Sequence, residues 1–76
     1  MSEEFKALTI HQKLEITIQE MIDRQIALHE ALAEVELIFL QLAEKKYKGK
    51  KVKMAEALGI HRNTLHHLLK KHRFHR

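Results

Sequence analysis

The chain has 76 residues with a net charge of +4, and it contains no cysteine, no proline and only two glycines. The absence of cysteine excludes disulfide bonds and thiolate zinc sites. No apolar run approaches the roughly 18 residues of a membrane span, and no basic start precedes an apolar signal segment, so we expect a cytoplasmic protein with no membrane partner. A chain this short forms a single domain over residues 1–76 and buries only about 60% of its unfolded surface, which makes oligomerisation a natural source of stability.

The charge is unevenly distributed along the chain. Residues 1–47 carry nine acidic and five basic side chains, whereas residues 48–76 carry one acidic and nine basic side chains. Phosphate neutralisation with counterion release supplies most of the non-specific affinity of DNA-binding proteins. The basic segment therefore predicts a polyanionic partner, with a solubilising surface as the alternative.

The composition favours helix throughout and predicts an all-α fold of four helices. Residues 1–9 have no clear period, and we expect a loose lead-in or a frayed first turn there. From Ile10, aliphatic residues at steps of three and four predict an amphipathic helix. We expect a break over residues 23–27, although no glycine or proline marks it, because one helix over residues 10–47 would be about 57 Å long, too long for a small monomer to cover.

The second helix is apolar on more than one side, so it has to be buried from more than one direction. Leu37 and Leu40 lie outside its broad face, and neither they nor Ile16 have an evident cover within one subunit. We therefore expect the two helices of residues 10–47 to interlock with those of a second copy as a dimeric four-helix bundle, with a partly exposed monomer as the alternative. The broad face consists of Leu28, Ala31, Leu32, Val35, Ile38, Phe39, Leu42 and Ala43. The expected dimer-interface residues are Ile18, Ile22, Val35, Leu37, Ile38 and Leu40.

A polar, basic link around Gly49 follows the second helix, and Gly49 predicts a left-handed residue that redirects the chain, with Tyr47 packed against the junction. Residues 50–73 then predict a helix-turn-helix. Gly59 ends the first helix of this motif, and Ile60 is expected to be a buried turn residue. The expected buried side of the first motif helix is Val52, Ala55 and Leu58, and that of the second is Leu65, Leu68, Leu69 and His72.

The run AEALGIHRNTL, with Gly49 before it and LLKKH after it, resembles the carboxy-terminal helix-turn-helix of the Fis (factor for inversion stimulation) family. That family includes Fis nucleoid proteins and the DNA-binding ends of NtrC-type activators, with A-x-x-L-G-I-x-R-x-T-L as a common core. The resemblance extends from about Leu28 to Phe74 and implies a homodimer that binds double-stranded DNA in transcription regulation or nucleoid organisation. The departures from the family pattern are Lys50 and Val52 near the usual Asn or Ser/Thr cap, His61 in place of Ser or Asn, and Leu68 in place of a basic residue.

The exposed side of the second motif helix is basic and rich in hydrogen-bonding groups, as expected of a helix that enters a major groove. Arg62 at the first turn is suited to guanine or phosphate, and Asn63 to adenine or backbone. His61 is expected to cap the helix through a ring nitrogen, and Thr64 to cap it or to bind phosphate. The lysines before the first motif helix are expected to hold phosphate. The expected DNA-binding residues are Lys50, Lys53, His61, Arg62, Asn63, Thr64, His66, His67, Lys70 and Lys71.

Other functions have weaker support in the residues. Five of the seven histidines lie near the C-terminus, His75 among them, but they lack the spacing and the carboxylate partner of a metal site, so we expect no metal and no cofactor. We expect no enzyme activity and no small-molecule substrate, because the chain has no phosphate loop or nucleophile–base pair and is too short to enclose a pocket. The remaining alternative is a helical module whose basic tail binds an acidic protein or a structured RNA.

Overall fold

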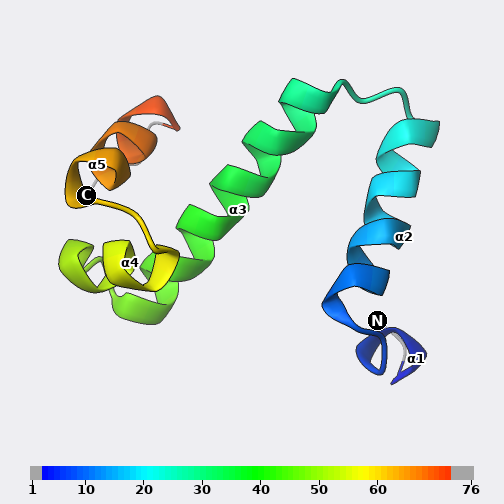
Figure 1. Cartoon of the computed structure of the whole chain (residues 1–76), viewed down its shortest axis with the longest axis horizontal. Coiled ribbons are helices and arrows are strands. Elements are labelled where there is room, and N and C mark those ends of the chain that lie inside the picture. Colours follow the sequence, from blue (N-terminus) through cyan, green and yellow to red (C-terminus); the bar gives the residue numbers. More distant parts are fainter. Residues whose placement is uncertain (1–2, 73–76) are drawn as a thin grey trace. The chain divides into compact units, whose positions relative to one another are not determined.

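The computed structural model describes residues 3–72, and this part of the chain contains helices and no strands. It holds five helices: α1 (Glu3–Lys6), α2 (Ile10–Asp23), α3 (Leu28–Tyr47), α4 (Lys51–Leu58) and α5 (Arg62–Lys71) (Figure 1). The all-α prediction is confirmed. The count exceeds the predicted four because α1, a single turn, lies within the expected lead-in. No helix of the described residues combines the length and the apolarity needed to cross a membrane.

Two compact units make up the chain, Met1–Leu32 and Ala33–Arg76, and the boundary between them falls within α3. In the first unit, α2 begins with a capping box that was not expected from the sequence. The hydroxyl of Thr9 accepts a hydrogen bond from the Gln12 backbone amide at 3.1 Å, and the Gln12 side chain accepts one from the Thr9 amide at 2.9 Å. Two backbone donors at the helix start are thereby satisfied, which fixes the first residue of α2.

The predicted break between α2 and α3 is present. Gln25 adopts the left-handed conformation with a φ of 59°, and the Ile26 amide donates to the Met21 carbonyl at 2.9 Å. This is the hydrogen-bonding pattern that usually ends a helix at a glycine. At the start of α3, the Ala27 amide donates to the Glu30 carboxylate at 3.2 Å. The break is therefore made by backbone and carboxylate hydrogen bonds without help from glycine or proline.

None of the 14 residues of α2, all of them described, is buried. Its aliphatic stripe is present as predicted, but Ile10, Leu14, Ile18 and Ile22 are exposed to solvent. Helices in water owe most of their stability to packing of an apolar face rather than to propensity. α2 thus has an apolar face that nothing in its own unit covers.

The second unit has a small core formed by α3, α4 and α5. Leu40, Met54 and Leu65 are its largest fully buried side chains, exposed by 1%, 1% and 0% respectively. Each comes from a different helix, so the core joins the helix-turn-helix to the C-terminal half of α3. Ala43, Ala55 and Leu69 complete the core, and Tyr47, Leu58, Ile60 and Leu68 pack against it. The predicted packing of Tyr47 and Leu68 is confirmed, whereas Ile60, predicted to be buried, is half-buried against the core.

The prediction for the two sides of α3 is wrong at Leu40. Leu40 was expected to need a second subunit, but it is covered by the helix-turn-helix of its own chain. Conversely, the broad face is largely open: Leu32, Phe39 and Leu42 are all more than half exposed. A helical period identifies two apolar sides but not which of them meets the subunit's own core.

The prediction of which α4 residues enter the core is also wrong at one position. Val52 was expected to be buried, but it is 57% exposed, and Met54 takes its place in the core. The spacing of Val52, Ala55 and Leu58 and the spacing of Met54, Ala55 and Leu58 both fit one side of a short helix. In an eight-residue helix the pattern is too short to choose between them.

Candidate nucleic-acid interface

The two sides of α5 differ sharply. Leu65 and Leu69 are buried in the core, Leu68 is half-buried, and the His72 side chain, just after the helix, is only 10% exposed. These four residues were expected on the buried side, and that prediction is confirmed. The predicted DNA-binding residues of α5 are all exposed: Arg62, Asn63, Thr64, His66, His67, Lys70 and Lys71. Because the leucines hold one side of α5 on the core, the opposite side is presented to solvent.

The turn before α5 has the predicted geometry. Gly59 ends α4 in the left-handed conformation with a φ of 67°, and the Ile60 amide donates to the Ala55 carbonyl at 3.0 Å. His61 then caps α5, since its Nδ1 accepts a hydrogen bond from the Asn63 amide at 3.0 Å. The expectation that a ring nitrogen caps this helix is confirmed. The cap fixes the first turn of α5, where Arg62 and Asn63 lie.

The start of α4 carries a group of lysines. Lys48, Lys50, Lys51 and Lys53 are all exposed. Lys50 occupies the N-cap position with no side-chain hydrogen bond to the helix. The backbone amides in the first turn of an α-helix have no carbonyl partner within the helix. Ammonium groups and helix amides therefore gather at one end of α4, an arrangement that attracts anions.

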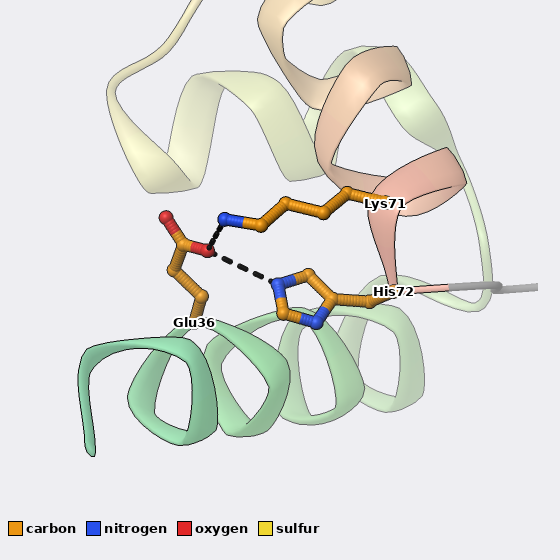
Figure 2. Close-up of polar contacts among 3 residues, drawn as sticks. All are labelled: Glu36, Lys71 and His72. Atoms are coloured by element: carbon orange, nitrogen blue, oxygen red, sulfur yellow. Dashed lines mark hydrogen bonds and ion pairs between the residues drawn. The ribbon is translucent and has the colours of Figure 1, made fainter. Parts of the chain in front are cut away.

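The far end of α5 is bonded to α3 through Glu36 (Figure 2). The Glu36 Oε1 atom accepts a hydrogen bond from the Lys71 Nζ atom at 3.1 Å and lies 3.0 Å from the His72 Nε2 atom. An ionised carboxylate only accepts hydrogen bonds, so Nε2 carries the proton in this contact. The hydrogen bonds from His72 and Lys71 hold the pKa of the Glu36 carboxyl below its ordinary value. We call these three residues the Glu36 cluster.

The Glu36 cluster was not predicted from the sequence, and Lys71 was expected only to contact nucleic acid. A signal was present, because Glu36, Leu40, Ala43 and Tyr47 follow one another at steps of four, three and four along α3. Leu40, Ala43 and Tyr47 all belong to or pack against the core of the helix-turn-helix. An acidic residue in the same register lies on the side of α3 that faces α5, whose last turn is basic.

The expected dimer-interface residues fall into three groups. Ile18, Ile22, Val35 and Ile38 are exposed, Leu37 is half-buried, and Leu40 is buried within its own unit. Leu40 is therefore excluded from a subunit interface by its packing. The exposed side of α3 instead contains residues at alternating steps of four and three, the spacing of helices that pair in bundles. These residues are Leu28, Leu32, Val35, Phe39 and Leu42.

A comparison with protein families decides the classification. The model of the bacterial regulatory proteins of the Fis family matches residues 31–72, which is more than half of the chain. The chain belongs to the Fis family. No curated protein and no solved structure matches it.

The Fis-family match begins in α3 and ends at His72, one residue after α5. It therefore contains the whole helix-turn-helix and the side of α3 on which that motif packs. The family's helix-turn-helix is a DNA-binding domain rather than a catalytic one. The predicted family resemblance is confirmed, and membership assigns the chain to the DNA-binding regulators.

Metal binding has no support in the described residues of this Fis-family chain. Residues 3–72 contain no group of three or more histidine, cysteine, aspartate or glutamate side chains arranged to hold an ion. His66 and His67 meet edge to face with ring centroids 6.2 Å apart, without a third ligand. His75, Arg73 and Phe74 lie outside the described residues.

Proposed function

We propose that this protein binds duplex DNA as a homodimer and acts in transcription regulation or nucleoid organisation, with α5 as a recognition helix in the major groove. The observation that carries the proposal is the two-sided α5 of a Fis-family chain. Leu65 and Leu69 hold one side on the core while polar and basic residues occupy the other. A helix held in this way presents a fixed set of donors to base edges.

The first turn of α5 is the end proposed to read bases. Arg62 and Asn63 are exposed there, and the His61 cap keeps the turn helical. Arginine binds guanine O6 and N7 with two hydrogen bonds, and asparagine pairs in the same way with adenine. His66 and His67 follow one turn later and are proposed to contact the groove or its edges. Thr64 is proposed to bind a phosphate, because His61 supplies the cap.

Phosphate contacts are proposed at both ends of the motif. Lys50 and Lys53 at the start of α4 are exposed beside unpaired helix amides. Lys70, in the last turn of α5, is exposed and has no ion pair within the described residues. Phosphate contacts set register and affinity rather than sequence preference. Lys50, Lys53 and Lys70 are therefore proposed to hold the duplex while Arg62 and Asn63 read it.

A homodimer is supported by the uncovered apolar surface of α2 and α3. α2 has no buried residue, and Phe39 is 59% exposed. Monomeric soluble proteins rarely expose long contiguous apolar stripes. Two copies of each helix forming a four-helix bundle would cover both stripes, through Ile18, Ile22, Val35 and Ile38 as expected and through Phe39 and Leu42 in addition. A symmetric dimer would offer two recognition helices to one duplex.

Selection from a pool of random duplexes, followed by fluorescence-anisotropy titration, tests this function. We expect the protein to enrich a preferred duplex, to bind it with two chains per duplex, and to lose affinity steeply as salt increases. A hairpin RNA and a polyglutamate of similar charge serve as controls for the alternative of a basic interaction module. Equal binding of the selected duplex and these controls would contradict the proposal.

A further inference from the structure

The Glu36 cluster joins residues that are 35 and 36 positions apart in sequence (Figure 2). Its members differ in exposure: the side chains of His72, Glu36 and Lys71 are 10%, 40% and 59% exposed. His72 is thus part of the packing between α5 and α3, whereas the Lys71 ammonium remains within reach of solvent. Lys71 could pair either with Glu36 or with a phosphate, and in the structure its ammonium group lies 3.1 Å from the Glu36 carboxylate.

We propose that Glu36 is a positioning residue for the recognition helix, which holds the end of α5 on α3 and withholds Lys71 from the DNA backbone. This inference rests on the proposed DNA binding and refines its contact set. In the protein as it exists, Lys70 contacts the backbone at the end of α5 and Lys71 does not. Glu36 thereby limits non-specific attraction of the duplex and favours binding that depends on the first turn of α5.

The angular spacing of side chains around α5 explains why only one of the two neighbouring lysines meets Glu36. Successive residues of an α-helix are turned by about 100° around its axis, so Lys70 and Lys71 point in clearly different directions. Lys70 lies seven residues after Asn63 and therefore on the same side of the helix. Lys71 lies nearer the side that packs on α3, where it meets Glu36. Asn63 and Lys70 thus lie on one surface, and Lys71, seven residues after Thr64, lies at its border next to α3.

The substitution Glu36→Gln separates this role from a merely structural one. Glutamine has the shape of glutamate and can still accept a hydrogen bond from His72, but it does not neutralise Lys71. Freed Lys71 should then neutralise one more phosphate. The expected result is a slope of log affinity against log salt that is steeper by about 0.9 for each bound subunit, equivalent to an additional loss of about 3.5-fold in affinity between 50 and 200 mM salt. Loss of a structural contact alone would weaken binding without steepening this slope.

Glu34→Gln is the matched control. Glu34 is exposed on the same helix and forms no hydrogen bond or ion pair with α5 within the described residues, so its substitution changes the net charge equally without freeing a lysine. A steeper slope in Glu36→Gln but not in Glu34→Gln excludes a general effect of charge. Lys71→Ala should leave the wild-type slope unchanged, and the double variant Glu36→Gln, Lys71→Ala should return to the wild-type slope.

The experiment is an anisotropy titration of the full chain with a random-sequence duplex at four salt concentrations. An unchanged slope in Glu36→Gln, or a slope reduced by about 0.9 in Lys71→Ala alone, would overturn the inference while leaving DNA binding in place. If circular dichroism shows Glu36→Gln to be unfolded, the Lys71→Ala slope decides by itself: unchanged supports the inference, and shallower overturns it. Absence of binding by the wild type would instead contradict the proposed function itself.

Discussion

The backbone amide of Asn63 donates a hydrogen bond to the Nδ1 atom of His61 at 3.0 Å, and this bond caps the helix proposed to read DNA. Helix caps are usually serine, threonine, aspartate or asparagine, which accept through oxygen. A ring nitrogen accepts only when it carries no proton, so the bond requires the tautomer with its proton on Nε2. The first turn of α5 therefore depends on one side chain of unusual type.

Substitution of His61 tests this dependence. His61→Ala removes the acceptor and should lower the free energy of unfolding by about 0.5–2 kcal/mol, whereas His61→Ser supplies a better cap and should equal or exceed the wild type. Urea denaturation followed by circular dichroism measures both. Equal stability of the alanine and wild-type proteins would show that the hydrogen bond does not contribute.

Substitutions of the neighbouring α3 residues Phe39 and Leu40 should affect different properties, the oligomeric state and the folding stability respectively. Leu40→Ala creates a cavity in the core of the second unit and should cost about 2–5 kcal/mol of folding free energy. Phe39→Glu places a charge on the exposed side and should shift the sedimenting species to the 9.0 kDa monomer without opening that core. Sedimentation and urea denaturation of the two variants distinguish these effects. A Phe39→Glu protein that sediments like the wild type would contradict the proposed interface.

Much of the helix-turn-helix could be predicted from the sequence because its signals are local. Gly59 marks the turn, and Leu65 and Leu69 mark the buried side of α5, and each depends on residues within one or two turns. Gln25 shows the limit of such signals. It adopts a left-handed conformation that glycine usually supplies, and only the hydrogen bonds around it reveal the helix end.

Contacts between residues far apart in the sequence could not be predicted in the same way. The helical period shows that α3 has two apolar sides, but only the packed structure shows that Leu40 meets Met54 and Leu65 within one core. The partners of Glu36 lie 35 and 36 residues away, and the register of α3 places Glu36 on the side of the core residues without identifying those partners. For α5, the sequence pattern therefore identified the side that faces solvent better than the contacts with α3 that hold the helix in place.

Substitutions of Arg62 and Lys70 should distinguish the contacts that set sequence preference from those that set affinity for any duplex. Arg62→Ala should weaken binding to the selected duplex by about 1–3 kcal/mol and relax the preference at one base position. Lys70→Ala should weaken binding to all duplexes alike and reduce the salt slope by about 0.9 for each bound subunit. Gel-shift titration against selected and random duplexes at two salt concentrations measures both. An Arg62→Ala protein that retains full preference would show that another residue reads the site.

Glu36 should make stability depend on pH in the acid range. Its pKa is lowered in the folded protein by His72 and Lys71, so its ionised form stabilises the fold above the ordinary glutamate range. That contribution is lost as the pH falls through the lowered pKa. The difference in melting temperature between the wild type and Glu36→Gln should therefore shrink from about pH 5 to about pH 3. Glu34→Gln is the control, and a difference that is constant over this range would contradict the assignment.

The most direct test of the account is NMR mapping of the backbone amides during titration with the selected duplex. Binding through α5 predicts the largest shift changes at His61, Arg62, Asn63 and Lys70 and at the start of α4, with smaller changes at the exposed residues of α2. Changes concentrated on α2 and on the exposed side of α3, or none in the first turn of α5, would contradict recognition by this helix.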